Sequence, residues 1–151
     1  MTDINSGGVA KLAERVQRLE DIEAIKALKA RYCARCDDGY DSDGIAELYT
    51  EDAVWDGGNT FGVREGREAI RKHFEAAASR VSIARHHVMN PVIEVDGDTA
   101  WVATDFAFVS RANTILSTGR YLDAMCRSPD RWRLASREIV FSGDTPVGVE
   151  G

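Results

Sequence analysis

The stretch LEDIEAIKALKARYCARCDDGYDSDGIAELYTEDAVW, residues 19 to 55, decides how this chain folds. Its first part repeats apolar residues at steps of three or four, namely Ile22, Ile25, Leu28 and Tyr32. This spacing places them along one side of a helix, and we expect that side to lie on a sheet. The helix then runs into the acidic pair Asp37-Asp38, a Gly-Tyr-Asp turn and the segment Leu48 to Trp55.

The acidic pair stands where this helix is predicted to end. A helix C-terminus repels negative charge, and two adjacent carboxylates in an apolar lining make each other harder to ionise. Such a carboxylate in a pocket is a candidate general base. The alternative is that Asp37 and Asp38 only cap and solubilise a turn, and the residue types alone favour that interpretation.

Length and charge bound the class of protein. A chain of 151 residues predicts one domain, large enough to bury a core and one pocket. With 19 Lys and Arg against 25 Asp and Glu, the net charge is -6, which argues against nucleic acid or an anionic membrane as partner. No apolar run reaches the about 18 residues of a membrane span. Residues 1–9 are mostly polar and contain no apolar signal core, so we expect a cytoplasmic protein with a flexible N-terminus.

The three cysteines do not indicate a disulfide framework, because their number is odd and no secretion signal accompanies them. Cys33 and Cys36 form a Cys-x-x-Cys pair late on the predicted helix, away from a helix N-terminus, where a redox motif lowers its thiol pKa. We therefore expect packed, reduced thiols. No cysteine or histidine spacing predicts a metal site, and no glycine-rich phosphate loop predicts a nucleotide cofactor.

Further along, the pattern changes from helices to strands. We expect a short helix over Asp43 to Tyr49, a short strand at Ala53 to Trp55 and a helix over Arg67 to Ala78. Long strands then flank the hairpin turn Asp96-Gly97-Asp98 and continue over Ile115 to Cys126 and Arg131 to Phe141. This order predicts an α+β fold, a curved antiparallel sheet with about three N-terminal helices on its concave face. We take residues 10–142 as the domain and 143–151 as a flexible tail.

Several residues are candidates for a site in the hollow of that fold. His86 and His87 open the first long strand, so alternation points one of them to the concave face. A histidine there, opposite a helix-end carboxylate, would form a proton-transferring pair, although a structural histidine fits the spacing equally well. Arg137, if buried, needs a carboxylate partner. Aromatic residues that could line an apolar cavity, or equally form ordinary core, are Trp55, Phe61, Trp101, Phe106, Phe108 and Tyr121.

Taken together, these segments resemble the SnoaL-like family of the nuclear transport factor 2-like superfamily. The resemblance rests on Leu19 to Tyr32, Asp37-Asp38 and Leu48 to Trp55, and it continues through Gly66 to Ile70, His86 with Asn90, Val95 to Ala100 and Trp132 to Arg137. It covers about residues 10 to 142. Members include bile acid 7α-dehydratase, scytalone dehydratase and polyketide cyclases, so the resemblance implies a cone-shaped α+β fold.

The resemblance also implies site residues. In dehydratase-like members an Asp at the end of the first helix and a His on the first long strand form the proton-transferring pair. In this sequence the resemblance implies that His86 is that histidine and that Arg137 is an arginine that lies nearby. Counting from Tyr32, which matches a dehydratase tyrosine, selects Asp37, whereas counting back from Trp55 selects Asp38; we favour Asp37 because the helix fixes its direction.

Two functions follow as hypotheses. The first is a cofactor-independent lyase or isomerase, dehydratase- or cyclase-like, that moves protons on an apolar ring-containing substrate such as a steroid or polyketide. The second is a non-catalytic module of the same fold that binds a small ligand or supports subunit assembly. In both cases the N-terminal helical arm has little neighbouring sequence to cover it, so we expect a homo-oligomer, a trimer or a dimer.

Overall fold

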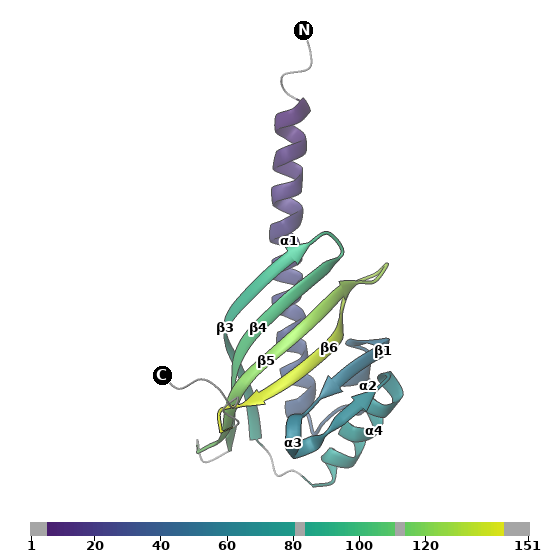
Figure 1. Cartoon of the computed structure of the whole chain (residues 1–151), viewed down its shortest axis with the longest axis vertical. Helices are drawn as coiled ribbons and strands as arrows, with labels where there is room; N and C mark the ends of the chain where they lie inside the picture. Colours follow the sequence, from purple (N-terminus) through teal and green to yellow (C-terminus); the bar gives the residue numbers. More distant parts are fainter. Residues whose placement is uncertain (1–5, 81–83, 111–113, 144–151) are drawn as a thin grey trace.

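A computed structural model of the protein describes residues 6–80, 84–110 and 114–143. In chain order the elements are α1 (Ser6–Asp37), α2 (Ser42–Ala46), β1 (Tyr49–Asp56), α3 (Gly58–Phe61), β2 (Val63–Glu65), α4 (Arg67–Ala78), β3 (Ala84–Asp96), β4 (Thr99–Ser110), β5 (Ile115–Arg127) and β6 (Trp132–Phe141). The strands form one curved sheet in the order β2-β1-β6-β5-β4-β3. Helix α1 crosses one face of it (Figure 1). The α+β fold predicted from the sequence is confirmed.

The inner half of α1 follows the predicted apolar stripe. Ile25, Leu28, Tyr32 and Cys36 are all buried at the sheet, and Ile22, at the end of the stripe, is half-buried. Their steps of three and four residues bring them onto one side of the helix. Cys33 and Cys36 are buried free thiols, as the sequence predicted.

The outer half of α1 extends beyond the sheet as an arm (Figure 1). The helix begins at Ser6, so residues 6–9 of the predicted flexible segment are helical. Residues 1–5 and 144–151, where the rest of that segment and most of the tail fall, lie outside the described residues. Asp21 marks the point where the arm joins the body, because its carboxylate accepts hydrogen bonds from Trp132 Nε1 at 3.1 Å and Arg127 Nη2 at 2.7 Å.

The β3–β4 hairpin forms where the sequence predicted it. Gly97 takes a φ of 57°, a left-handed conformation that glycine adopts without a steric cost, and this closes the turn between Asp96 and Thr99. The register between β3 and β4 shifts between Met89 and Val92, next to Asn90, whose φ is 53°. This irregularity bends β3 next to helix α1.

The sheet differs from the sequence prediction in the direction of one strand pairing. It is mixed rather than wholly antiparallel, because β1 pairs with β6 in parallel while the other neighbours are antiparallel. Of the helices, α1 covers the sheet, whereas α4 packs on β1 and on α2 at one end. The short elements α3 and β2 lie between the expected strand at Ala53 to Trp55 and the expected helix over Arg67 to Ala78, and the sequence predicted neither of them. Among the helices of the described ranges, none has the length and apolar composition needed to cross a membrane.

Two leucines of α1 give a matched test of this arrangement. Leu28 is 1% exposed and Leu19 is 63% exposed. We expect Leu28→Ala to lower the free energy of unfolding by about 2–5 kcal/mol, because it leaves a cavity in the core. Leu19→Ala should change it by no more than about 0.5 kcal/mol. Urea unfolding at low protein concentration measures both, and equal losses would contradict the packing of α1 described above.

Candidate active site

The C-terminal end of α1 meets the start of β3 at a carboxylate–imidazole pair. Asp37 Oδ1 lies 2.8 Å from His86 Nδ1 and also accepts a hydrogen bond from the backbone N–H of His86 at 2.9 Å. Both bonds join Asp37 to His86, which is 49 positions later in the chain. Asp38, the alternative candidate, is exposed, so Asp37 is the acid that contacts the histidine.

The pairing defines the tautomer of the ring. An ionised carboxylate only accepts hydrogen bonds, so His86 Nδ1 carries the proton and donates it to Asp37. The lone pair of Nε2 is then free to accept a proton. Burial lowers the pKa of His86 below its usual 6.5, and this outweighs the opposing effect of the hydrogen bond with Asp37. The imidazole is therefore neutral at pH 7.

Aromatic rings surround the pair. Phe108 lies with its ring centroid 4.7 Å from that of His86, and Tyr40 meets His86 edge-on at 6.0 Å. Burial raises the pKa of Tyr40 to about 12, so its phenol stays protonated. Of the aromatic residues expected to line the hollow, Phe108 is the one in contact with the imidazole. The sequence analysis did not single out Tyr40; its place in the turn directly after the acidic pair is the signal that could have identified it.

The remaining aromatic candidates occupy different positions. Trp55, Phe106 and Tyr121 are buried and belong to the packed interior, with Phe106 stacked on Tyr121. Phe61 is 47% exposed, and its ring centroid lies 6.2 Å from that of Trp55. Trp101 does not line the interior: it is 45% exposed, and strand alternation turns it away from α1, toward which its neighbour Val102 points.

Arg137 is fully buried and has the carboxylate partner that the sequence analysis required, but that partner is Asp123. Its Nε and Nη2 atoms bind the two oxygens of Asp123 at 2.7 and 2.9 Å. Its guanidinium lies between the rings of Tyr32 and Tyr121, with Cζ 4.1 and 4.2 Å from their centroids. Tyr32 is thus part of the wall around Arg137, and burial raises its pKa.

Lys29, on the inner side of α1, completes this buried group. Its ammonium donates a hydrogen bond to Asp123, so the carboxylate is shared by two cations. Burial and the charge of Arg137 lower the pKa of Lys29 to about 8. The pKa of Asp123 is lowered because the charges of Arg137 and Lys29 outweigh the opposing effect of burial. Sequence reasoning missed Lys29 and Asp123; the inward phase of Lys29 on the helical stripe is the signal that could have found it.

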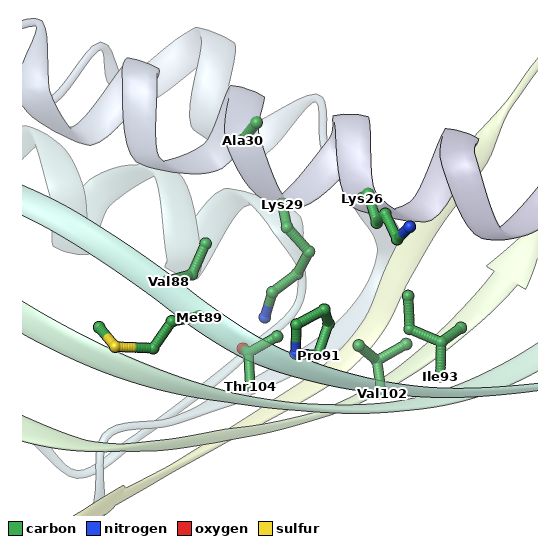
Figure 2. Close-up of a pocket in the computed structure, with 9 residues that line it drawn as sticks. All are labelled: Lys26, Lys29, Ala30, Val88, Met89, Pro91, Ile93, Val102 and Thr104. Atoms are coloured by element: carbon green, nitrogen blue, oxygen red, sulfur yellow. The ribbon is translucent and has the colours of Figure 1, made fainter.

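A cavity of about 190 Å³ lies between α1 and the strands β3 and β4 (Figure 2). Lys26, Lys29 and Thr104 contribute its polar side chains, and Val88, Pro91 and Val102 are among its apolar ones. None of the residues predicted from the sequence as a site lines this cavity. In the ranges that the structure describes, no three His, Cys, Asp or Glu side chains are arranged to hold a metal ion.

The tautomer of His86 gives a direct test of the pair. We expect the ¹⁵N shifts of His86 at pH 7.5 to show a protonated Nδ1 and an unprotonated Nε2. Asp37→Ala should weaken this preference for the Nδ1-protonated tautomer, because it removes the oxygen that accepts the Nδ1 proton. Asp38→Ala is the matched control and should leave the shifts unchanged. A wild-type ring protonated on Nε2 alone would contradict the assigned hydrogen bond.

Solved structures of other proteins share the fold of this chain. A D-to-N variant of the protein Rv3472 from Mycobacterium tuberculosis, described as of unknown function, is 29% identical over 89% of this chain and 82% of its own, with a TM-score of 0.74. A nuclear transport factor 2-like protein with a cystatin-like fold from Novosphingobium aromaticivorans is 27% identical over 96% of this chain and 94% of its own, with a TM-score of 0.78.

A third structure, from the same Novosphingobium species and provisionally described as a scytalone dehydratase, is 23% identical over 89% of this chain and 97% of its own. Its TM-score of 0.76 shows that the two proteins share a fold. Among curated proteins, none matches this chain significantly. The model of the SnoaL-like domain matches residues 17–138, which include α1 from Gln17 onward, both members of the Asp37–His86 pair, strands β1 to β5 and β6 as far as Glu138. The chain therefore belongs to the SnoaL-like family.

Proposed function

We propose that this protein is a cofactor-independent lyase or isomerase, dehydratase- or cyclase-like, in which Asp37 and His86 transfer protons. The observation that carries the proposal is the 2.8 Å contact between Asp37 Oδ1 and the ring of a half-buried histidine. A neutral imidazole with a fixed tautomer and a free Nε2 is suited to general base catalysis near neutral pH. Membership of a family whose fold also occurs in a protein described as a dehydratase is consistent with this chemistry.

The steps follow from the geometry of the pair. His86 Nε2 removes a proton next to an activating carbonyl of the substrate. The resulting imidazolium is stabilised by the Asp37 carboxylate on its other nitrogen. His86 then returns the proton to the leaving group or to another carbon of the substrate. Tyr32, the other proton donor suggested by the resemblance, lies against Arg137 inside the core, so we assign the return of the proton to His86.

The surroundings of the pair indicate the class of substrate. Phe108 and Tyr40 present aromatic surface beside the imidazole. Such surfaces favour an apolar, ring-containing molecule, of which steroids and polyketides are examples. Arg137, with two of its three nitrogens bound to Asp123, positions the wall of the interior and does not meet the substrate.

A second candidate function is subunit assembly without chemistry, and the arm of α1 favours it. Val9, Leu12, Val16 and Leu19 are each 44–63% exposed, and their spacing of three, four and three residues forms one continuous apolar stripe. An exposed stripe of this kind is typical of a helix that packs on another subunit. We accordingly propose a homo-oligomer, a dimer or a trimer, for either function.

Deuterium exchange tests the proton transfer before the product is known. A panel of ketosteroids and aromatic polyketides is incubated in D₂O with the protein, and deuterium incorporation next to the carbonyl is followed by mass spectrometry. We expect exchange with wild type, and a loss of about 100- to 10,000-fold in Asp37→Asn and in His86→Gln, because each removes one member of the base. Asp38→Asn is the control and should exchange like wild type.

The proposed mechanism would be contradicted if both Asp37→Asn and His86→Gln exchanged deuterium at the wild-type rate. A protein that binds members of the panel without exchanging any of them would instead support the binding or assembly module.

A further inference from the structure

The cavity beside Lys29 is separate from the Asp37–His86 pair and is small. It opens between α1 and the β3–β4 strands, and Figure 2 shows Lys29 reaching from the helix toward Thr104 on the sheet. Its volume of about 190 Å³ lies below the range of about 300–1,000 Å³ typical of pockets for drug-sized ligands. A single ring or a short branched chain therefore fits it, and the apolar side chains of Val88, Pro91 and Val102 suit such a body.

The charged residues that line this cavity are both cations. Lys26, whose side chain is 47% exposed, is paired with Glu23 at 2.7 Å on the protein surface. Lys29 is buried and forms the inner side of the cavity. No Asp or Glu is among the lining residues, so an anion entering the cavity meets no like charge in its wall.

The buried charges behind Lys29 are not balanced. Lys29 and Arg137 carry two positive charges, and Asp123 supplies one carboxylate for both. Arg137 Nη1 is buried without a hydrogen-bond partner in the described part of the chain. Burying an unbalanced charge is costly, and the lowered pKa of Lys29 has this origin together with its burial. A second anion near Lys29 would remove the imbalance.

Thr104 independently points to a ligand in the same place. Its side chain is buried, lines the cavity, and its Oγ1 has no hydrogen-bond partner among the described residues. A buried hydroxyl without a partner costs free energy that an incoming acceptor recovers. The hydroxyl and the remaining N–H groups of the Lys29 ammonium are the donors that a carboxylate needs.

We propose that this cavity binds a small monocarboxylate with an apolar body. The carboxylate accepts hydrogen bonds from Lys29 Nζ and Thr104 Oγ1 and balances the buried positive charge, while the body packs against the apolar wall. This inference involves neither Asp37 nor His86, so it stands or falls independently of the proposed proton transfer.

Calorimetric titration of the whole 151-residue chain with benzoate tests this site, and benzamide, which has the same shape without the charge, is the matched ligand. We expect benzoate to bind at least tenfold more tightly than benzamide. Lys29→Met should weaken benzoate at least tenfold, and Thr104→Val, which removes only the hydroxyl, should weaken it about three- to tenfold. Lys72→Met removes an exposed lysine of α4 outside the cavity; it is the matched control and should change the affinity less than threefold, and Asp37→Asn should not change it.

Proton uptake adds a readout that non-specific binding would not give. The bound carboxylate favours the charged form of Lys29, so it raises the pKa of that group from about 8. At pH 8 the wild type should therefore take up a fraction of a proton on binding benzoate, seen as a binding enthalpy that depends on the buffer. The uptake should vanish at pH 6, where Lys29 is already charged, and in Lys29→Met.

Three results would overturn the proposal: no benzoate binding at millimolar concentration, equal affinity for benzoate and benzamide, or benzoate binding that Thr104→Val leaves unchanged. Thr104→Val keeps the test decisive if Lys29→Met fails to fold, because valine has the shape of threonine and leaves the buried ion pairs intact.

Discussion

One buried carboxylate links α1 to the sheet. Asp123 on β5 binds Arg137 of the neighbouring strand β6 with both oxygens and also accepts a hydrogen bond from Lys29 of the helix. Removing one partner from such a buried group typically costs about 3–5 kcal/mol, because the other charges stay buried without compensation. The group therefore acts together with the apolar stripe of Ile25, Leu28 and Tyr32 in fixing which side of α1 faces the sheet. With Lys29 turned inward, the helix brings Asp37, eight residues later, to the start of β3.

The same group influences the chemistry of the imidazole. The positive charge of Arg137 adds to the effect of burial in lowering the pKa of His86, and Asp37 only partly opposes them. The two sites consequently differ in character. One is a neutral base held by a carboxylate at the end of the helix, and the other is a buried cationic centre next to a small apolar cavity. The proposed substrate would lose its proton at the Asp37–His86 pair, and the proposed anion would bind beside Lys29.

Much of this arrangement could be predicted from the sequence. The spacing of Ile25, Leu28 and Tyr32 gave the buried side of α1, and the turn residues at Gly97 gave the β3–β4 hairpin. The contact of Asp37 with His86 could be anticipated only from the family resemblance, since residue spacing carries no information about the distance across the fold. The rest depends on tertiary contacts. The phase of Lys29 on the helix points inward, but lysine is usually exposed, and its partner Asp123 lies 94 residues away in the chain. Alternation did not reveal which face Trp101 occupies, and the parallel pairing of β1 with β6 joins segments far apart in the chain.

The proposed chemistry requires His86 to be a neutral, half-buried base whose ring is held by Asp37, so the pKa of His86 is the quantity to measure. An NMR titration of the His86 ring carbon signals between pH 4 and 8 gives that pKa in the free protein. We expect a value below 6.5, because burial and the charge of Arg137 outweigh the hydrogen bond with Asp37. A value clearly above 6.5 would show an imidazolium stabilised by Asp37 at neutral pH and would contradict the proposed base.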